Sequence, residues 1–241
     1  MAQADERPAA VVEPSPGFLS NLFGLYFGPG AAFGSILKKP SFWAPLLVFV
    51  ALQLTFTGVW LQRLDMLEFL RNQAEEAGRP FQAPPEQAMG FVRGMFWASA
   101  VVFTPIMVLV IAAVYLFVFR FFLASEVTFK QAFTIVAYAF LAVALVHTPL
   151  ILLTMALKGD WNLDPRVVVA ANPTILLDKT STAKPLYALA QSLDLFYLWT
   201  LFLVAVGFAV ACRRKTGDVL AAVLVPWGIV VAIMVGVAAL F

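Results

Sequence analysis

Two ionisable side chains lie in or beside long apolar stretches, where they could do chemistry. His147 is the single histidine of the chain and lies within such a stretch, while Asp194 comes directly before eighteen uncharged residues. An ionisable group inside a membrane is a functional candidate by default, because burying its charge in lipid is costly. The pair could therefore serve the transport of a small solute.

Each of the two side chains also has a purely structural interpretation. His147 stands two residues before Pro149, and its ring could bond a backbone carbonyl that the proline leaves free in a helix. Asp194 could accept hydrogen bonds from the free N–H groups at the start of a helix, and Ser192 could share that role. A third possibility is that Asp194 bonds a neighbouring span or a partner protein. The first cations to test as its partners are Lys158 and Lys184.

The sequence holds no recognised catalytic or cofactor-binding pattern. HExxH, the phosphate-binding P-loop and GxGxxG are all absent, and these are the patterns that would indicate a zinc hydrolase, an NTPase or a dinucleotide enzyme. One cysteine, Cys212, and one histidine exclude a cluster built on several Cys or His ligands. We therefore expect no catalytic residues, no cofactor and no metal site. A net charge of +2 is too small to indicate nucleic-acid binding.

The elements that must position these residues are membrane spans. The chain has 241 residues, of which 62% are hydrophobic and 12% are charged, whereas soluble domains average about 45–50% apolar and about 25% charged residues. Windows without Asp, Glu, Lys or Arg are long enough to cross about 30 Å of hydrocarbon as helices. They predict spans at 44–62, 96–119, 131–156, 193–212 and 219–240, with inner prolines that kink three of them, Pro105, Pro149 and Pro226.

The rest of the chain divides into a tail, an N-terminal segment and two longer loops. Residues 1–17 are polar and proline-rich, which predicts a disordered tail. Residues 18–43 mix aromatic residues with glycine, and they indicate an amphipathic segment in the membrane interface, with a loop as the alternative. Residues 44–241 form the five-helix membrane domain. Of the loops at 63–93 and 157–192, the first should start as a helix. The second has turn signals and two stretches, VVVA (167–170) and TILL (174–177), that could be short strands or interfacial pieces.

Charge density predicts the orientation of the chain. Lysine and arginine are equally numerous on the two sides, but Arg213, Arg214 and Lys215 fill a six-residue loop, and Lys38 and Lys39 adjoin the first span. The positive-inside rule applies best to such short loops near span ends. We therefore expect the N-terminus on the cytoplasmic side and the C-terminus outside.

Three stretches of the sequence together resemble the Yip1-domain family. The first, GPGAAFGSILKKPSFWAPLL (28–47), has a basic Lys-Pro, an aromatic residue and a proline opening span one. The second, VTFKQAFTIVAYAF (127–140), leads to a Tyr-Ala in span three, and the third, LDLFYLWTLFLVAVGF (193–208), matches a Leu-Asp-x-Phe-x-Leu-Trp segment. The family often has a proline soon after the Tyr-Ala, whereas here the nearest is Pro149. The positions that carry the resemblance include Lys38, Lys39, Trp43, Tyr138, Asp194 and Trp199.

The resemblance implies a five-span bundle without known catalysis. Eukaryotic members of the family are linked to vesicle traffic and Rab-type GTPases, and some bacterial members are accessory to ABC-type export systems. This sequence looks closer to the bacterial form, which implies a cytoplasmic membrane, contact with the lipid bilayer and another integral membrane protein as partner, such as exporter subunits. The expected function is a non-enzymatic scaffold or accessory subunit. A transporter or channel using His147 and Asp194 is the alternative, and an intramembrane hydrolase is a more distant one.

Overall fold

The structure is a computed structural model that describes residues 16–178 and 181–240. Most of the predicted tail at 1–17 lies outside these described residues. Every regular element within them is helical. The elements are α1 (Phe18–Phe27), α2 (Pro29–Ile36), α3 (Trp43–Leu61), α4 (Met66–Glu76), α5 (Glu86–Ala98), the π-helical turn η1 (Ser99–Phe103), α6 (Thr104–Leu123), α7 (Phe129–Lys158), the 3-10 turn η2 (Pro173–Leu176), α8 (Lys184–Ser192), α9 (Leu195–Cys212) and α10 (Thr216–Leu240).

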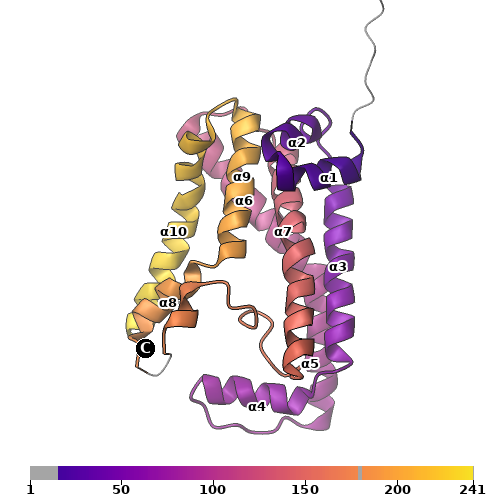
Figure 1. Ribbon diagram of the computed structural model, residues 1–241, viewed down its shortest axis with the longest axis vertical. Coiled ribbons are helices and arrows are strands. Elements are labelled where there is room, and N and C mark those ends of the chain that lie inside the picture. Colours follow the sequence, from indigo (N-terminus) through magenta and orange to yellow (C-terminus); the bar gives the residue numbers. More distant parts are fainter. Residues whose placement is uncertain (1–15, 179–180, 241) are drawn as a thin grey trace, which may run out of the picture.

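The described residues contain five helical runs that are long and apolar enough to cross a membrane. The first run is α3, and the second is continuous from α5 to α6. The other three are α7, α9 and α10. All five lie along one common direction in the bundle (Figure 1). The expected fold class, an all-α membrane protein with five transmembrane helices, is therefore confirmed.

The second span begins several residues earlier than predicted and runs without interruption over Ala88–Phe122. The charge of Arg93 ended the apolar window in the sequence, but this side chain is exposed, and a long basic side chain can reach the headgroup level. The turn η1 precedes Pro105, which has no backbone N–H to donate. The helix widens there into a π turn, in which the N–H of Thr104 donates to the carbonyl of Ser99.

Helices α7 and α9 form the centre of the bundle. About half of their most apolar windows is buried, 56% for α7 and 50% for α9. They approach closely at Gly207, where a Cβ atom would lie 2.4 Å from Cγ2 of Ile135 on α7 and 3.2 Å from the ring of Phe33 on α2. The next residue, Phe208, stacks on Phe119 of α6 with ring centroids 4.2 Å apart. Through the neighbouring residues Gly207 and Phe208, α9 therefore packs against three other helices, α2, α6 and α7.

The N-terminal segment is a pair of helices rather than a loop. Gly28 separates α1 from α2, and α2 begins with a proline at its first position, where the missing N–H does no harm. Leu25 and Phe33 are almost fully buried, and the hydroxyl of Tyr26 donates to the carbonyl of Ala142 on α7 at 2.6 Å. The pair therefore lies across one end of the bundle and is part of its core (Figure 1). Its position in the membrane interface stays a prediction.

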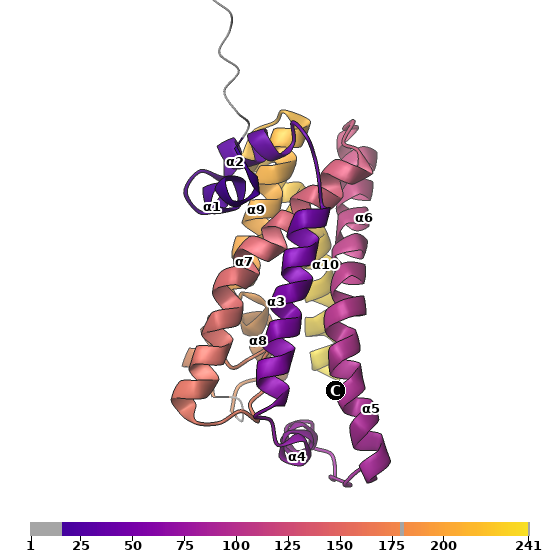
Figure 2. The ribbon, with the colours of Figure 1, turned by 90° about the vertical axis from the view of Figure 1, so that its right-hand side faces the viewer.

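The opposite end of the bundle carries α4 and the second long loop (Figure 2). Helix α4 is the helix that was expected at the start of the first loop. Asp65 caps it by accepting hydrogen bonds from the N–H groups of Leu67 and Glu68. Of the two stretches proposed as short strands, 167–170 begins at the end of a turn and continues as a bend, and 174–177 overlaps the 3-10 turn η2. Helix α8 was not predicted, although Pro185 in its first turn is a helix-start signal.

Candidate functional site

Two adjoining cavities lie where the tip of the second long loop inserts between the spans. Their volumes are about 580 Å³ and about 350 Å³. We call them together the loop groove. Both cavities are lined by Gln53 and Phe56 of α3 and by Pro165 and Arg166 of the loop. The larger cavity extends toward α4 and η1, and the smaller one extends along α7 to the start of α9. The larger cavity is also lined by Thr57, Trp60, Phe69, Leu70, Gln73, Phe96, Ser99, Ala100, Thr104 and Asp164.

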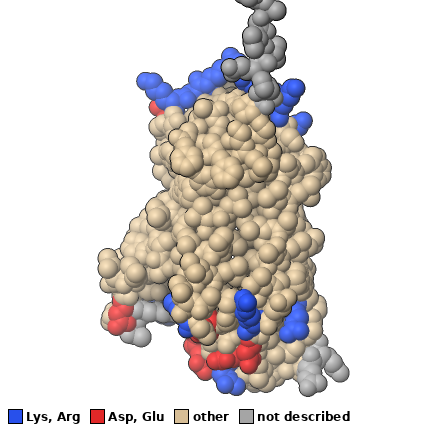
Figure 3. All heavy atoms as spheres, turned by 45° about the vertical axis from the view of Figure 1, so that its right-hand side comes forward, with Lys and Arg blue, Asp and Glu red and all other residues tan. Residues whose placement is uncertain are grey.

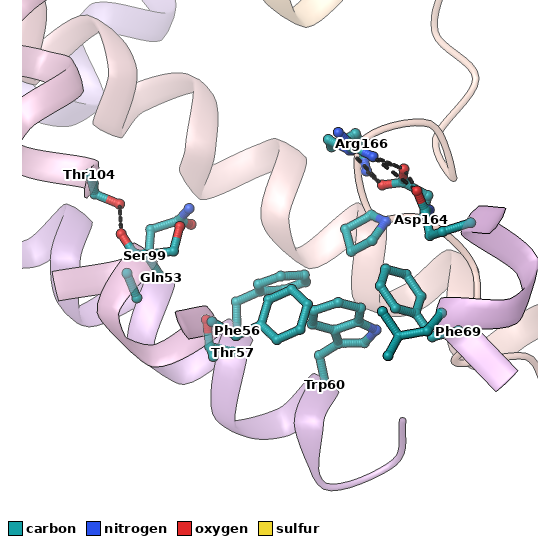
Figure 4. Close-up of a pocket in the computed structure, with 14 residues that line it drawn as sticks. Gln53, Phe56, Thr57, Trp60, Phe69, Ser99, Thr104, Asp164 and Arg166 are labelled. Atoms are coloured by element: carbon teal, nitrogen blue, oxygen red, sulfur yellow. Dashed lines mark hydrogen bonds and ion pairs between the residues drawn. The ribbon is translucent and has the colours of Figure 1, made fainter. Parts of the chain in front are cut away.

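Aromatic rings form one wall of the larger cavity (Figure 4). Trp60 lies at the centre, stacked on Phe56 at 6.0 Å and edge-on to Phe69 and Phe96 at 5.3 and 5.1 Å. Its indole N–H donates to the carbonyl of Trp161 at 2.9 Å. The wall therefore joins α3, α4, α5 and the second long loop into one rigid apolar surface.

The loop tip is fixed by Asp164. Its carboxylate accepts hydrogen bonds from the backbone N–H of Arg166 at 2.9 Å, from the Arg166 guanidinium and from the amide of Gln73 at 3.1 Å. Burial by itself raises the pKa of Asp164, but these hydrogen bonds and the charge of Arg166 outweigh it and hold the pKa below its usual value. The Asp164 side chain is 8% exposed and that of Arg166 is 77% exposed. Arg166 can therefore offer further N–H groups to an anionic ligand.

The smaller cavity brings together His147 and Asp194, which are far apart in the sequence. Asp194 caps α9 by accepting hydrogen bonds from the N–H groups of Phe196 at 3.0 Å and Tyr197 at 3.1 Å. The ring of Phe196 stacks on His147 of α7, with centroids 4.4 Å apart. Both ionisable residues line the same cavity as Arg166. Arg166, rather than Lys158 or Lys184, is thus the cation that shares a cavity with Asp194.

Two structural expectations for this region were wrong in detail. Among the described residues, His147 makes the ring contact with Phe196 and no hydrogen bond to a carbonyl freed by Pro149. The hydroxyl of Ser192 donates to the carbonyl of Leu189 instead of sharing the cap of α9. His147 is oriented by Phe196, which lies far away in the sequence, whereas Ser192 bonds within its own helix because α8 extends to this residue.

The other residues singled out from the sequence lie outside the loop groove. Trp199 contacts the ring of Tyr26 at 5.7 Å, and Tyr138 contacts the ring of Phe18 at 5.8 Å, so both pack against α1. Lys38, Lys39 and Trp43 are exposed at the end of the bundle where α3 begins, and Pro149 lies inside α7.

Several groove residues were missed as site residues in the sequence. Gln53 and Thr57 of α3 line the groove, whereas Thr55 bonds back to the carbonyl of Ala51. The available signal was their spacing of four residues, which places both on one face of α3. Asp164 and Arg166 gave no signal beyond a turn, because their place in the groove depends on how the loop folds back.

The groove can bind polar groups beside an apolar wall, and nothing in it indicates a metal centre. Within residues 16–178 and 181–240, no three His, Cys, Asp or Glu side chains are placed to hold a metal ion. The polar groups are amides, hydroxyls, one exposed guanidinium, one imidazole and two carboxylates, of which Asp164 and Asp194 already accept hydrogen bonds.

Comparison with known proteins identifies the family of the chain. The Yip1 domain model matches residues 23–238, which include part of α1, all of α2 and all five spans except the last two residues of α10. No curated protein matches the chain, and no solved structure matches it. Because the family match extends over most of the sequence and the fold has the five apolar spans, the protein belongs to the Yip1 domain family of multi-pass membrane proteins.

Proposed function

We propose that this protein is a non-enzymatic membrane scaffold or accessory subunit that binds another integral membrane protein. The observation that carries the proposal is the uneven burial of the spans. Only 17% of the most apolar window of α10 and 22% of that of the second span is buried, against 56% for α7. These two spans are neighbours, and the hydroxyl of Tyr115 on α6 lies 3.4 Å from the carbonyl of Val223 on α10. We call the outward surfaces of these two spans together the α6–α10 face.

The α6–α10 face has features that suit contact with another helix. Small residues recur four apart on the side of α10 that points away from Val223 and α6, at Gly228, Ala232 and Gly236, and a Cβ atom on either glycine would meet no other atom within 4 Å. Small residues let the backbones of two membrane helices approach closely. A crevice of about 220 Å³ beside Pro226 and Trp227 lies between α6, α9 and α10 and could take a side chain of the partner. By the family resemblance, a subunit of an ABC-type exporter is the first partner to test.

The proposal is tested by recovering partners from membranes in mild detergent. We expect the wild-type chain to co-purify with an integral membrane protein and Ala232→Leu to lose most of that partner, because the larger side chain blocks close approach. Ala51→Leu is the matched control, since Ala51 is an exposed alanine of α3 on another face. Equal recovery by both variants would contradict a partner on the α6–α10 face, and recovery of no membrane protein would contradict the scaffold function.

A transporter remains the second candidate, and one observation supports it. His147 and Asp194 line one cavity, together with Gln53 and Arg166, so the polar groups near this end of the spans are not isolated from each other. If the purified chain alone moved a solute across liposomes, and Asp194→Asn abolished the movement, the scaffold proposal would be wrong.

A further inference from the structure

A polar cavity lies at the end of the bundle opposite the loop groove. It has a volume of about 420 Å³. It lies between the loop that joins α6 to α7 and the loop that joins α9 to α10. We call it the arginine cavity. Its lining residues are Leu123, Ala124, Ser125, Glu126, Gln131, Ala211, Cys212, Arg213 and Arg214.

Arginine side chains hold the cavity in shape. The guanidinium of Arg214 donates to the carbonyl of Leu123 at 3.2 Å, and Nε of Arg120 donates to the carbonyl of Val127 at 3.1 Å. The two bonds fix both ends of the α6–α7 loop. A guanidinium carries five N–H donors, and Arg214 uses one of them in this bond. Arg213 and Arg214 are both exposed, so both can donate further hydrogen bonds to a ligand in the cavity.

The loop also places an unpaired hydroxyl in the cavity wall. Ser125 Oγ is buried beside the Cys212 thiol, a weak hydrogen-bonding group, and among the described residues it is the one buried side-chain polar atom without a hydrogen bond of normal geometry. A buried polar atom without a partner costs free energy and calls for an explanation. A ligand that offers acceptor oxygens to Ser125 and to the arginines would remove this cost.

The position of the cavity indicates where such a ligand comes from. The cavity opens where two apolar spans end, at Leu123 of α6 and at Ala211 and Cys212 of α9. Lysine and arginine gather at this end of the molecule (Figure 3). Basic pockets between membrane helices at this depth suit the headgroups of phospholipids. Glu126 also lines the cavity, and the two arginines outweigh its charge.

We propose that the arginine cavity binds the phosphate group of a membrane phospholipid. Arg213 and Arg214 bind the phosphate oxygens, Ser125 donates a hydrogen bond to one of them, and the acyl chains lie along the exposed apolar surface of the neighbouring spans. Arg–phosphate pairs are among the stronger charge-assisted hydrogen bonds. The bound lipid would bridge the two loops and hold α6 and α7 against α9 and α10.

The test measures the thermal stability of the purified chain in detergent as ligands are added. We expect phosphatidylglycerol to raise the melting temperature, and diacylglycerol with the same acyl chains to leave it unchanged. Arg213→Gln should weaken the apparent affinity roughly tenfold, because a charge-assisted hydrogen bond is lost. Lys130→Gln removes the same charge at the same end but outside the cavity, and it should retain the wild-type response.

A second variant keeps the test independent of folding effects. Ser125→Ala removes the unpaired hydroxyl, so it should leave the lipid-free melting temperature unchanged or raise it, while it weakens the response to phosphatidylglycerol. Equal responses of Arg213→Gln and Lys130→Gln would overturn the proposal, since they would indicate attraction to the basic surface as a whole. An equal shift with inorganic phosphate would overturn the lipid as the source of the phosphate group.

Discussion

Asp194 is a single residue on which the start of a span and the loop groove both depend. Its carboxylate accepts two hydrogen bonds in the first turn of α9, and it lines the same cavity as His147 and Arg166. Capping requires an acceptor oxygen, whereas attraction to a cation requires the charge. Substitutions that separate the oxygen from the charge therefore distinguish the two roles.

Asp194→Asn should lower the melting temperature in detergent only slightly, since Asn caps about as well as Asp and only the interaction of the charge with the helix dipole is lost. Asp194→Leu should cost about 1 kcal/mol of stability, because two N–H groups lose their acceptor. Ser192→Ala is the control, since this hydroxyl bonds to Leu189 and takes no part in the cap. Equal losses from Asn and Leu would reject capping as the main role and indicate that the charge holds a neighbouring group.

At the level of elements, the glycines of α9 and α10 have opposite surroundings. Gly207 lies against Ile135 and Phe33, and both of these side chains are fully buried. Gly236 on α10 has no neighbouring atom within 4 Å of a built Cβ. The first glycine permits two helices to touch, and the second leaves a helix surface open.

Gly207→Ala should destabilise the protein by about 1–3 kcal/mol, because the added methyl forces a β-branched side chain to move in a filled core. Gly236→Ala should be neutral or slightly stabilising, since alanine is the better helix former and meets no obstacle. Thermal unfolding of both variants in one detergent measures the difference. Equal melting temperatures would contradict the close packing of α9 against α7.

For the whole molecule, the two ends of the bundle differ in charge. The end with α1 and α2 is mainly basic among the described residues, with Lys38, Lys39, Arg120, Lys130, Arg213, Arg214 and Lys215 against Glu126 and Asp218. At the other end, basic residues of α4, α5 and the second long loop are mixed with many acids. The positive-inside rule therefore predicts that the basic end faces the cytoplasm.

The predicted topology can be tested with a membrane-impermeant thiol reagent in intact cells, in a chain whose Cys212 is replaced by serine. Thr216→Cys should resist the reagent, because residue 216 lies at the basic end, and a cysteine added after Phe241 should react. Permeabilised cells, in which both should react, provide the control. The reverse pattern of labelling would overturn the orientation.

The sequence by itself determined the features that depend on local physics. Five spans followed from apolar length, because a backbone in lipid must pair its own hydrogen bonds. An acid directly before an apolar helix made a cap at Asp194 one of three interpretations, and the hydrogen bonds of the structure show that cap. The family followed from three short stretches in order. The early start of the second span and helix α8 were missed, because exposed Arg93 and the short length of α8 hid them from an apolar window.

Only the tertiary structure decided which residues meet. The loop groove joins Gln53 of α3, Asp164 and Arg166 of a loop, and His147 and Asp194 of two further spans. The arginine cavity likewise needs two loops that lie side by side. Apolar length fixes that a helix spans the membrane, but not how it rotates about its axis or which helix lies next to it. Those choices depend on close packing between helices, as at Gly207, and so the sites appear only when the helices are assembled.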